Sequence, residues 1–240
     1  MPSLPELARV HDRYLSIAGL AREHFQDTLS GKLLLCSGWS TDGVATVVAA
    51  SIAGAASLYV DADAESLRRA LRSGFIDFVV GQLDESLRIL KNELRRGRPV
   101  SVGLSADPEE CIAAVIDRGL QPDLIAAVPQ RHVSVFLARG ATALPEPTPE
   151  ASTAILYWSV ADDPVASMQS IARIAAGCLD PTRADTRTRR HWLEQSPRYL
   201  GRAFGSQQCV RMTEEEAAAF APRIHAEFPT ATITSDGENL

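Results

Sequence analysis

Apolar residues follow two alternating patterns along the first half of the chain. Short continuous apolar runs, which indicate buried strands, cover residues 32–37, 57–60, 75–80, 99–104 and 124–128. Segments of helical spacing lie between them at 44–56, 64–72, 83–96 and 107–118. Strands separated by helices of this length form βα units, so the pattern predicts an α/β fold with a parallel sheet and flanking helices.

The two ends of the chain extend this pattern. Residues 4–26 have apolar positions at helical spacing and predict an N-terminal helix. Beyond prolines at 145, 147 and 149, strands are predicted at 154–161, 208–212 and 230–234, and helices at 165–178 and 213–228. We therefore expect an N-terminal helix over 1–30, a parallel-sheet domain over 31–140, a proline-rich connector over 141–152 and a smaller C-terminal α/β appendage over 153–240.

The strand predicted at 154–161 carries a run of large apolar side chains, namely Ile155, Leu156, Trp158 and Val160. An appendage of this size has a thin core of its own. We therefore expect this run to be buried against the first domain or against a second subunit of a homo-oligomer.

Composition and charge narrow the classes of protein and partner. The chain has 240 residues, of which 45% are hydrophobic and 22% charged, as in ordinary globular proteins. It has neither an apolar run long enough to span a bilayer nor a basic–apolar leader, so we expect a cytoplasmic protein without membrane contact. The net charge of −6 argues against nucleic acid as a partner and leaves a small-molecule ligand or a dinucleotide.

The cysteines and histidines do not form a recognised ligand pattern. Neither CxxC, CxxH nor HExxH spacing occurs, so we expect no metal site. Cys36 ends a predicted strand and has no partner base nearby in the sequence, which favours a buried core cysteine over a nucleophile.

The strongest chemical signal is the turn that follows the first strand. A small-residue turn from Gly38 to Gly43 leads into a helix, and the next strand ends at Asp61, 23 residues after Gly38. In dinucleotide-binding βαβ units, the helix N-terminus faces a pyrophosphate, and a carboxylate about 20 residues later accepts hydrogen bonds from a ribose. The alternative is a βαβ crossover without a ligand, in which Asp42 caps the helix.

Several stretches of the first domain occur in the order and nearly the spacing of a known family. They are Gly31-Lys32, Ser37-Gly38, Ile52-Ala53-Gly54, Leu71–Asp77, Leu83–Leu87, Arg98–Leu104 and Val115–Leu124. Together, residues from about 31 to 125 resemble the central NAD-binding domain of urocanase (urocanate hydratase). The resemblance implies a Rossmann-like parallel sheet over 31–140 and NAD as the cofactor.

Two segments depart from the family. Its loop G-L-G-G-M-x-G-A is replaced by residues 38–45, in which Ser40 and Thr41 stand for glycines, although both are small enough to admit a phosphate. Its T-D-Q-T-S-x-H segment, next to NAD and substrate, corresponds to residues 126–132, where only His132 matches. The expected cofactor-binding residues are Gly38, Ser40, Thr41, Gly43, Asp61 and Asp63, and the expected catalytic residues are His132 and Arg131.

Two functions are compatible with these observations. In the family, the nicotinamide is an electrophile that bonds to the substrate and permits the addition of water. The incomplete glycine loop favours a diverged protein that keeps the dinucleotide-binding fold without ordinary urocanate hydratase activity. The acids at Asp61 and Asp63 keep open an active NAD-dependent hydratase or lyase that acts on urocanate or a related small imidazole or carboxylate substrate.

A basic stretch in the second half of the chain has two interpretations. Six arginines between Arg183 and Arg202 are interleaved with His191, Trp192 and Tyr199. Cations among aromatic side chains can hold phosphates or bases. Asp185 and Glu194 dilute the charge, which favours the solvated face of a helix with Trp192 turned to the core.

Overall fold

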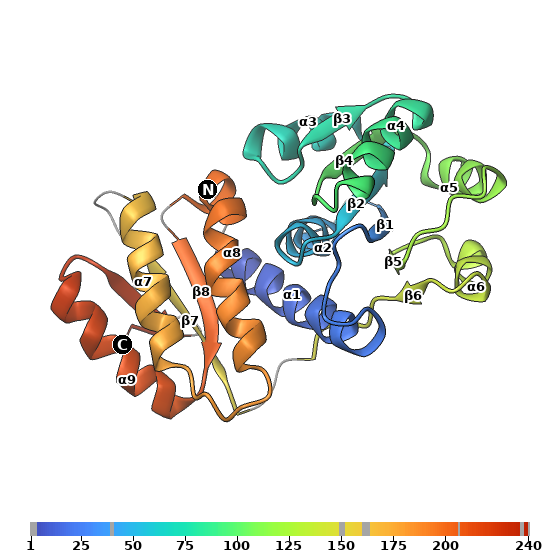
Figure 1. The fold of residues 1–240 in the computed structure, drawn as a ribbon. Coiled ribbons are helices and arrows are strands. Elements are labelled where there is room, and N and C mark those ends of the chain that lie inside the picture. Colours follow the sequence, from blue (N-terminus) through green and yellow to red (C-terminus); the bar gives the residue numbers. More distant parts are fainter. Residues whose placement is uncertain are drawn as a thin grey trace. The chain divides into compact units, whose positions relative to one another are not determined.

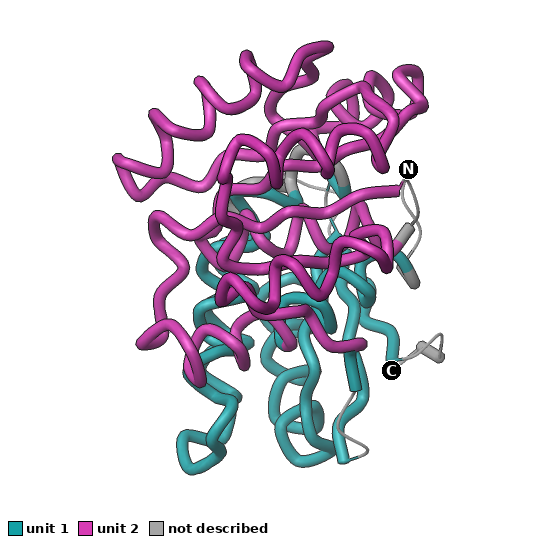
Figure 2. Tube along the Cα trace, turned by 90° about the vertical axis from the view of Figure 1, so that its right-hand side faces the viewer, with its two compact units in different colours: residues 1–15, 147–240 teal, residues 16–146 magenta. Residues whose placement is uncertain are grey.

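A computed structural model describes residues 4–38, 41–148, 152–159, 164–205, 207–235 and 238–239 of the protein (Figure 1). They form two compact units (Figure 2). Residues 16–146 make one, called here the parallel-sheet unit, and residues 1–15 with 147–240 make the other, the antiparallel-sheet unit. Helix α1 (Leu4–His24) contributes to both. In the described part of the chain, every helix is too short or too polar to cross a membrane.

Six parallel strands form the centre of the parallel-sheet unit. They are β1 (Leu33–Ser37), β2 (Ala56–Asp61), β3 (Phe78–Val80), β4 (Ser101–Ser105), β5 (Leu124–Ala126) and β6 (Thr142–Ala143). Their order is β3-β4-β2-β1-β5-β6, and every neighbouring pair is parallel. The chain builds one side of β1 first and then crosses to the other, so the strand order reverses between β1 and β5. The predicted Rossmann-like α/β sheet is confirmed.

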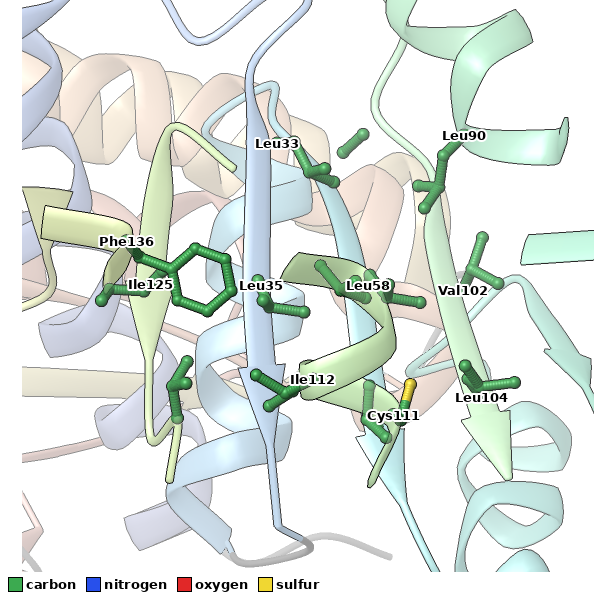
Figure 3. Packing of buried hydrophobic residues seen from close by; sticks show 14 of the residues in the cluster. Leu33, Leu35, Leu58, Leu90, Val102, Leu104, Cys111, Ile112, Ile125 and Phe136 are labelled. Carbon is green, nitrogen blue, oxygen red and sulfur yellow. The ribbon is translucent and has the colours of Figure 1, made fainter. Parts of the chain in front are cut away.

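Helices cover both faces of this sheet. One face carries α2 (Thr41–Ile52) and α3 (Ala64–Ser73), and the other carries α4 (Leu83–Arg95), α5 (Pro108–Asp117) and α6 (Gln130–Ala138). Successive strand residues point to opposite faces, so each strand serves both layers. Leu35 and Leu58 pack with Ile112 of α5 (Figure 3). Cys36 and Tyr59 pack against α2 and α3, and Cys36 is fully buried, as expected of a core cysteine.

Side-chain caps define where several of these helices begin. Asp63 precedes α3 and accepts hydrogen bonds from the backbone N–H groups of Glu65 and Ser66. Asp107 precedes α5 and accepts from the backbone N–H of Glu110. Each cap lies two residues after the end of a strand, so the chain turns from strand to helix at one edge of the sheet.

The structure corrects four details of the elements predicted in this unit. Residues 130–138 form α6, although no helix was predicted there, and β6 was not predicted either. The strand predicted at 124–128 ends at 126, because Ala127 adopts a positive φ of 50° and leaves the extended conformation. The strand predicted at 75–80 begins at 78, because the Asp77 carboxylate accepts hydrogen bonds from the Ser101 backbone N–H and hydroxyl and holds a turn.

The antiparallel-sheet unit has its own sheet and helices. Its strands are β7 (Ala154–Ser159), β8 (Gln207–Met212), β9 (Thr232–Ser235) and β10 (Glu238–Asn239), in the order β10-β9-β7-β8. Its helices are α7 (Pro164–Cys178), α8 (Thr186–Phe204) and α9 (Glu214–Glu227), with α7 in contact with both α8 and α9. Ile155, Leu156 and Trp158 of β7 are buried, and Trp158 packs against Phe220 of α9 with ring centroids 5.3 Å apart. Val160 lies outside the described residues.

The first half of α1 belongs to this unit through buried contacts. Leu7 and Val10 are buried. The Arg211 guanidinium on β8 donates to both carboxylate oxygens of Asp12, with Nε–Oδ1 and Nη2–Oδ2 distances of 2.7 and 2.8 Å. Such a bidentate pair fixes both the position and the orientation of a helix. The N-terminal residues are therefore part of the C-terminal unit.

Helix α8 combines a buried face with an exposed face. Trp192 is fully buried and donates a hydrogen bond to the Cys209 carbonyl, in agreement with the interpretation that it faces the core. Arg189 does not fit the interpretation of the basic stretch as a solvated helix face, because it is fully buried. Its guanidinium donates to both carboxylate oxygens of Glu216, at 2.6 and 3.0 Å, and to Asp185.

A histidine is enclosed between α1 and α8. His11 is fully buried, and its ring meets the edge of Trp192 with ring centroids 4.8 Å apart. Its Nδ1 lies 3.5 Å from Oδ1 of Asp12. Burial lowers the pKa of His11, an effect that Asp12 opposes and that the charges of Arg211 and Arg189 reinforce.

This histidine predicts how stability depends on pH. The folded protein holds His11 neutral, whereas the unfolded chain takes up a proton near its ordinary pKa, so stability is present above that pKa and is lost as the pH falls. Between about pH 7 and 5, we expect the free energy of unfolding to decrease by up to about 1.4 kcal/mol per pH unit from this group. His11→Phe should flatten that dependence in urea titrations.

A surface histidine provides the control. The His24 side chain is 42% exposed, so His24→Gln should keep the pH dependence of the native protein. An equally steep dependence in His11→Phe would show that other groups are responsible.

Candidate functional site

The glycine turn and the acidic strand end meet at the carboxyl edge of the parallel sheet. Strands β1 and β2 pair so that Ser37 lies opposite Val60, which brings the following residues, Gly38 and Asp61, side by side. The Gly38 N–H donates to the Val60 carbonyl at 3.0 Å and extends the pairing into the turn. Two features separated by 23 residues in the sequence therefore occupy one place.

The two glycines of the turn have different tasks. Gly38 has a φ of +81°, a conformation that side chains disfavour, and it allows the chain to turn sharply after β1. Gly43 lies in α2 where a Cβ would be 2.8 Å from the Tyr59 Oη and 3.0 Å from the Gly38 carbonyl oxygen. The Tyr59 hydroxyl donates to that same carbonyl at 2.7 Å. A tight turn and close helix–strand packing are the tasks of two of the three glycines in a dinucleotide-binding loop.

The middle of the loop is only partly described. Ser40 lies outside the described residues, and Thr41 is the first residue of α2. Asp42 is exposed and lies inside the first turn of α2, after Thr41. A cap precedes the helix, so the interpretation of Asp42 as the helix cap is wrong. The N-terminus of α2 lies at the same edge as Gly38, where its N–H groups favour an anion and the Asp42 carboxylate opposes one.

The two candidate carboxylates have different surroundings. Asp61 is 7% exposed at the end of β2, and its Oδ1 accepts a hydrogen bond from the Asp63 N–H at 2.7 Å. Asp63 caps α3, and hydrogen bonds from the Ser66 hydroxyl and backbone, with that from Glu65, lower the pKa of its carboxyl. Asp63 is therefore engaged in starting a helix, whereas Asp61 is the carboxylate that the strand register brings beside Gly38.

A second loop reaches this edge after β5. The Ser37 hydroxyl donates to the Ala127 carbonyl at 2.7 Å, which ties the loop after β1 to the loop after β5. Ala127 has a φ of 50°, an uncommon conformation for a residue with a side chain. The strand order reverses between these two strands, and open α/β sheets bind ligands outside the carboxyl ends of strands at such a point. Ser37 and Ala127 were not predicted as site residues, although Ser37 is the polar end of an apolar run and could have been recognised from that.

Arg131 and His132 occupy the first turn of α6. The Arg131 Nε lies 2.5 Å from Oε2 of Glu109 and 3.1 Å from Nε2 of His132. The His132 Nε2 lies 3.4 Å from the same carboxylate oxygen, and its side chain is 13% exposed. The two expected catalytic residues thus form a cluster with Glu109, in the first turn of α5. Glu109 was not predicted as a site residue, although an acid shortly after a strand that ends at this edge could have indicated it.

This cluster has proton-transfer and anion-binding groups. The Arg131 Nε–H group faces both the Glu109 carboxylate and Nε2 of His132. The Glu109 carboxylate compensates the charge of Arg131. The rest of the loop is apolar, and Val128 packs into the core below α5 and α6.

A comparison with known families matches the same part of the chain. Residues 9–136 match the family described as the urocanase Rossmann-like domain. This stretch is just over half of the chain. It includes every residue considered above, from the glycine turn to the cluster at the start of α6.

The packing at Gly43 predicts the effect of a single methyl group. Gly43→Ala places a Cβ against Tyr59 and the Gly38 carbonyl, so we expect a loss of about 1–2 kcal/mol in the free energy of unfolding. Tyr59→Phe removes the atom nearest to that Cβ and should restore part of the loss in the double variant, as measured in a thermodynamic cycle.

The matched control is another helical glycine. At Gly19 in α1, an added Cβ meets nothing within 4 Å, so Gly19→Ala should stabilise the protein by about 0.5–1 kcal/mol. If Gly43→Ala is equally stabilising, α2 does not depend on the close approach of Tyr59.

Proposed function

The chain belongs to the urocanase family, and from this membership we propose that it binds NAD at the carboxyl edge of the parallel sheet without hydrating urocanate. The observation that carries the proposal is the pairing of β1 with β2, which sets the Gly38 turn beside the Asp61 carboxylate. A turn that admits a pyrophosphate and an adjacent acceptor for ribose hydroxyls are the two requirements of a dinucleotide site.

The residues divide the binding tasks. The Gly38–Gly43 turn and the N-terminus of α2 face the pyrophosphate, with small residue types at Ser40 and Thr41. Asp61 accepts hydrogen bonds from the adenosine ribose. A carboxylate at this point also repels a 2′-phosphate, so NAD binds in preference to NADP. Asp63 caps α3, and its backbone N–H donates to the Asp61 carboxylate and so helps to hold that carboxylate in place.

The residues after β5 support a protein that lacks urocanate hydratase activity. In the family, bound NAD supplies an electrophile, and polar groups of the T-D-Q-T-S-x-H segment surround it and the substrate. Here the corresponding first four residues, Ala126 to Pro129, have no side chain that exchanges a proton or donates a hydrogen bond. Preorganised polar groups each contribute several kcal/mol of barrier lowering, about 2.7–4 for one oxyanion-hole donor.

One observation favours the alternative of an active hydratase or lyase. Arg131, His132 and Glu109 are in contact at the edge where the dinucleotide is proposed to bind. An arginine that recognises a carboxylate and a histidine that moves a proton suit a small imidazole or carboxylate substrate. In this alternative His132 transfers the proton, and Arg131 releases the Glu109 carboxylate and binds the carboxylate of the substrate.

Calorimetric titration with NAD tests the binding proposal. We expect Asp61→Asn to weaken NAD binding about tenfold or more, because a charged acceptor of two hydroxyl groups becomes neutral. The same change should reduce the preference for NAD over NADP. The variant keeps an oxygen that can accept the Asp63 N–H, so the turn is preserved.

Asp63→Asn is the matched control for this titration. Asparagine caps helices about as well as aspartate, so α3 is retained and NAD affinity should remain unchanged. If Asp63→Asn lowers the NAD affinity more than Asp61→Asn does, Asp63 and not Asp61 binds the ribose. Absence of heat with native protein at about 1 mM NAD, a concentration well above typical dinucleotide Kd values, would overturn the proposal.

An ultraviolet assay of urocanate tests the absence of hydratase activity. With NAD present, we expect no enzymatic loss of urocanate absorbance, because most polar groups of the family's segment are missing. Turnover of about one per second, within the usual range for enzymes, would favour the active alternative. In that case His132→Asn should abolish it and His24→Asn should not.

A further inference from the structure

We propose that the antiparallel-sheet unit contains a second binding site, which holds the phosphate group of a small phosphate ester. The site is a pocket of about 420 Å³ at the start of α8. Its walls include Arg183 of the preceding loop and Arg187, Arg190, His191 and Glu194 of α8. This pocket belongs to a different unit from the proposed dinucleotide site and does not depend on that site.

The helical spacing explains why these side chains gather in one place. Along α8, positions 187 and 190 and positions 191 and 194 are three residues apart, and positions 187 and 191 and positions 190 and 194 are four apart, so all four share one face. The loop before α8 adds Arg183 from another direction. The neighbouring Arg189 points away from this face and is buried against Glu216. The basic stretch is thus divided into a structural arginine and a group that faces a pocket.

Contacts from other elements hold part of this group in position. The Tyr14 hydroxyl of α1 lies 2.8 Å from Nδ1 of His191. The Arg190 Nε donates to the Ala176 carbonyl of α7 at 3.3 Å, a contact that uses one of its five N–H donors. The Arg183 Nε lies 3.2 Å from Oδ1 of Asp185. Cations that are oriented before binding lose less conformational entropy when a ligand arrives.

The charges of the pocket favour an anion. Three arginines and one glutamate line it, and Asp185 contacts Arg183, so the cations of this group outnumber its carboxylates by one. Like charges three residues apart on a helix repel each other, as Arg187 and Arg190 do, and an anion between them removes that repulsion. The pocket also lies at the N-terminus of the 19-residue helix α8, where the helix dipole favours negative charge.

The arrangement of donors favours phosphate over a carboxylate. One guanidinium fork can satisfy a planar carboxylate, whereas a phosphate group offers oxygens in several directions. Here the donors come from a loop and from successive turns of a helix. The pocket volume falls within the usual range for small ligands. The pocket has the size of a small-ligand site and the chain has a net charge of −6, so a small ester fits better than a nucleic acid.

Calorimetric titration of the full chain with inorganic phosphate and with glycerol phosphate tests this site. We expect both to bind, and the double variant Arg187→Gln, Arg190→Gln to weaken the binding about tenfold or more. The single variant Arg190→Lys, which keeps the charge and loses the fork, should have an intermediate affinity. Succinate, a dicarboxylate, should bind more weakly than phosphate.

Matched controls separate this site from general charge and from the dinucleotide site. The double variant Arg68→Gln, Arg72→Gln removes the same charge from exposed positions on α3 and should leave phosphate binding unchanged. Saturating NAD should also leave it unchanged. The pocket variant should keep the native circular dichroism spectrum, thermal midpoint and NAD affinity. If the double variant Arg187→Gln, Arg190→Gln is less stable than the native protein, the phosphate affinity of Arg190→Lys is compared with that of the native protein instead.

Three results would overturn the proposal. The first is phosphate binding that the pocket variant retains, or that NAD displaces. The second is succinate binding equal to that of phosphate. The third is absence of phosphate binding up to about 10 mM, a concentration that corresponds to negligible affinity, together with binding of a single-stranded oligonucleotide that the pocket variant loses.

Discussion

The parallel pairing of β1 on both of its edges is the constraint on which the proposed dinucleotide site depends. All five residues of β1 are buried, and the strand pairs with β2 on one side and β5 on the other. The Asp123 carboxylate holds its start, since it accepts hydrogen bonds from the Leu33 N–H at 2.9 Å and from Lys32 Nζ at 3.0 Å. A slip of one residue would turn every β1 side chain to the other face and separate Gly38 from Asp61.

The same strand determines how closely helix and loop can approach the site. Gly43 lets α2 come within contact of Tyr59, whose hydroxyl holds the Gly38 carbonyl. On the other edge, the Ser37 hydroxyl holds the backbone of Ala127. Both loops at the reversal of strand order are therefore fixed by side chains of the sheet itself, which is the kind of support that a preorganised ligand site requires.

The antiparallel-sheet unit includes the N-terminal residues and contains several charged side chains that are buried in pairs. Burying Arg189 without partners would be costly, and Glu216 and Asp185 supply its hydrogen bonds. The Asp12–Arg211 pair connects α1 to β8. Arg189 is paired inside the unit, whereas Arg187 and Arg190 lie at the surface and give the pocket near the start of α8 its positive charge.

Local patterns in the sequence were sufficient for the strand–helix alternation, the parallel sheet and the family, because each depends on residues that are close together in the chain. The Gly38–Asp61 spacing likewise indicated a dinucleotide fold from one βαβ unit. Tertiary structure alone decided the rest. The Ser37–Ala127 contact, the approach of Glu109 to Arg131, and the joining of residues 1–15 to 147–240 all bring together segments whose separation in the chain hides the pairing. Arg189 and Arg190 are adjacent on one helix, yet Arg189 is buried against Glu216 and Arg190 lines the pocket. The carboxylates and strands that pack against each side of the helix decided this difference.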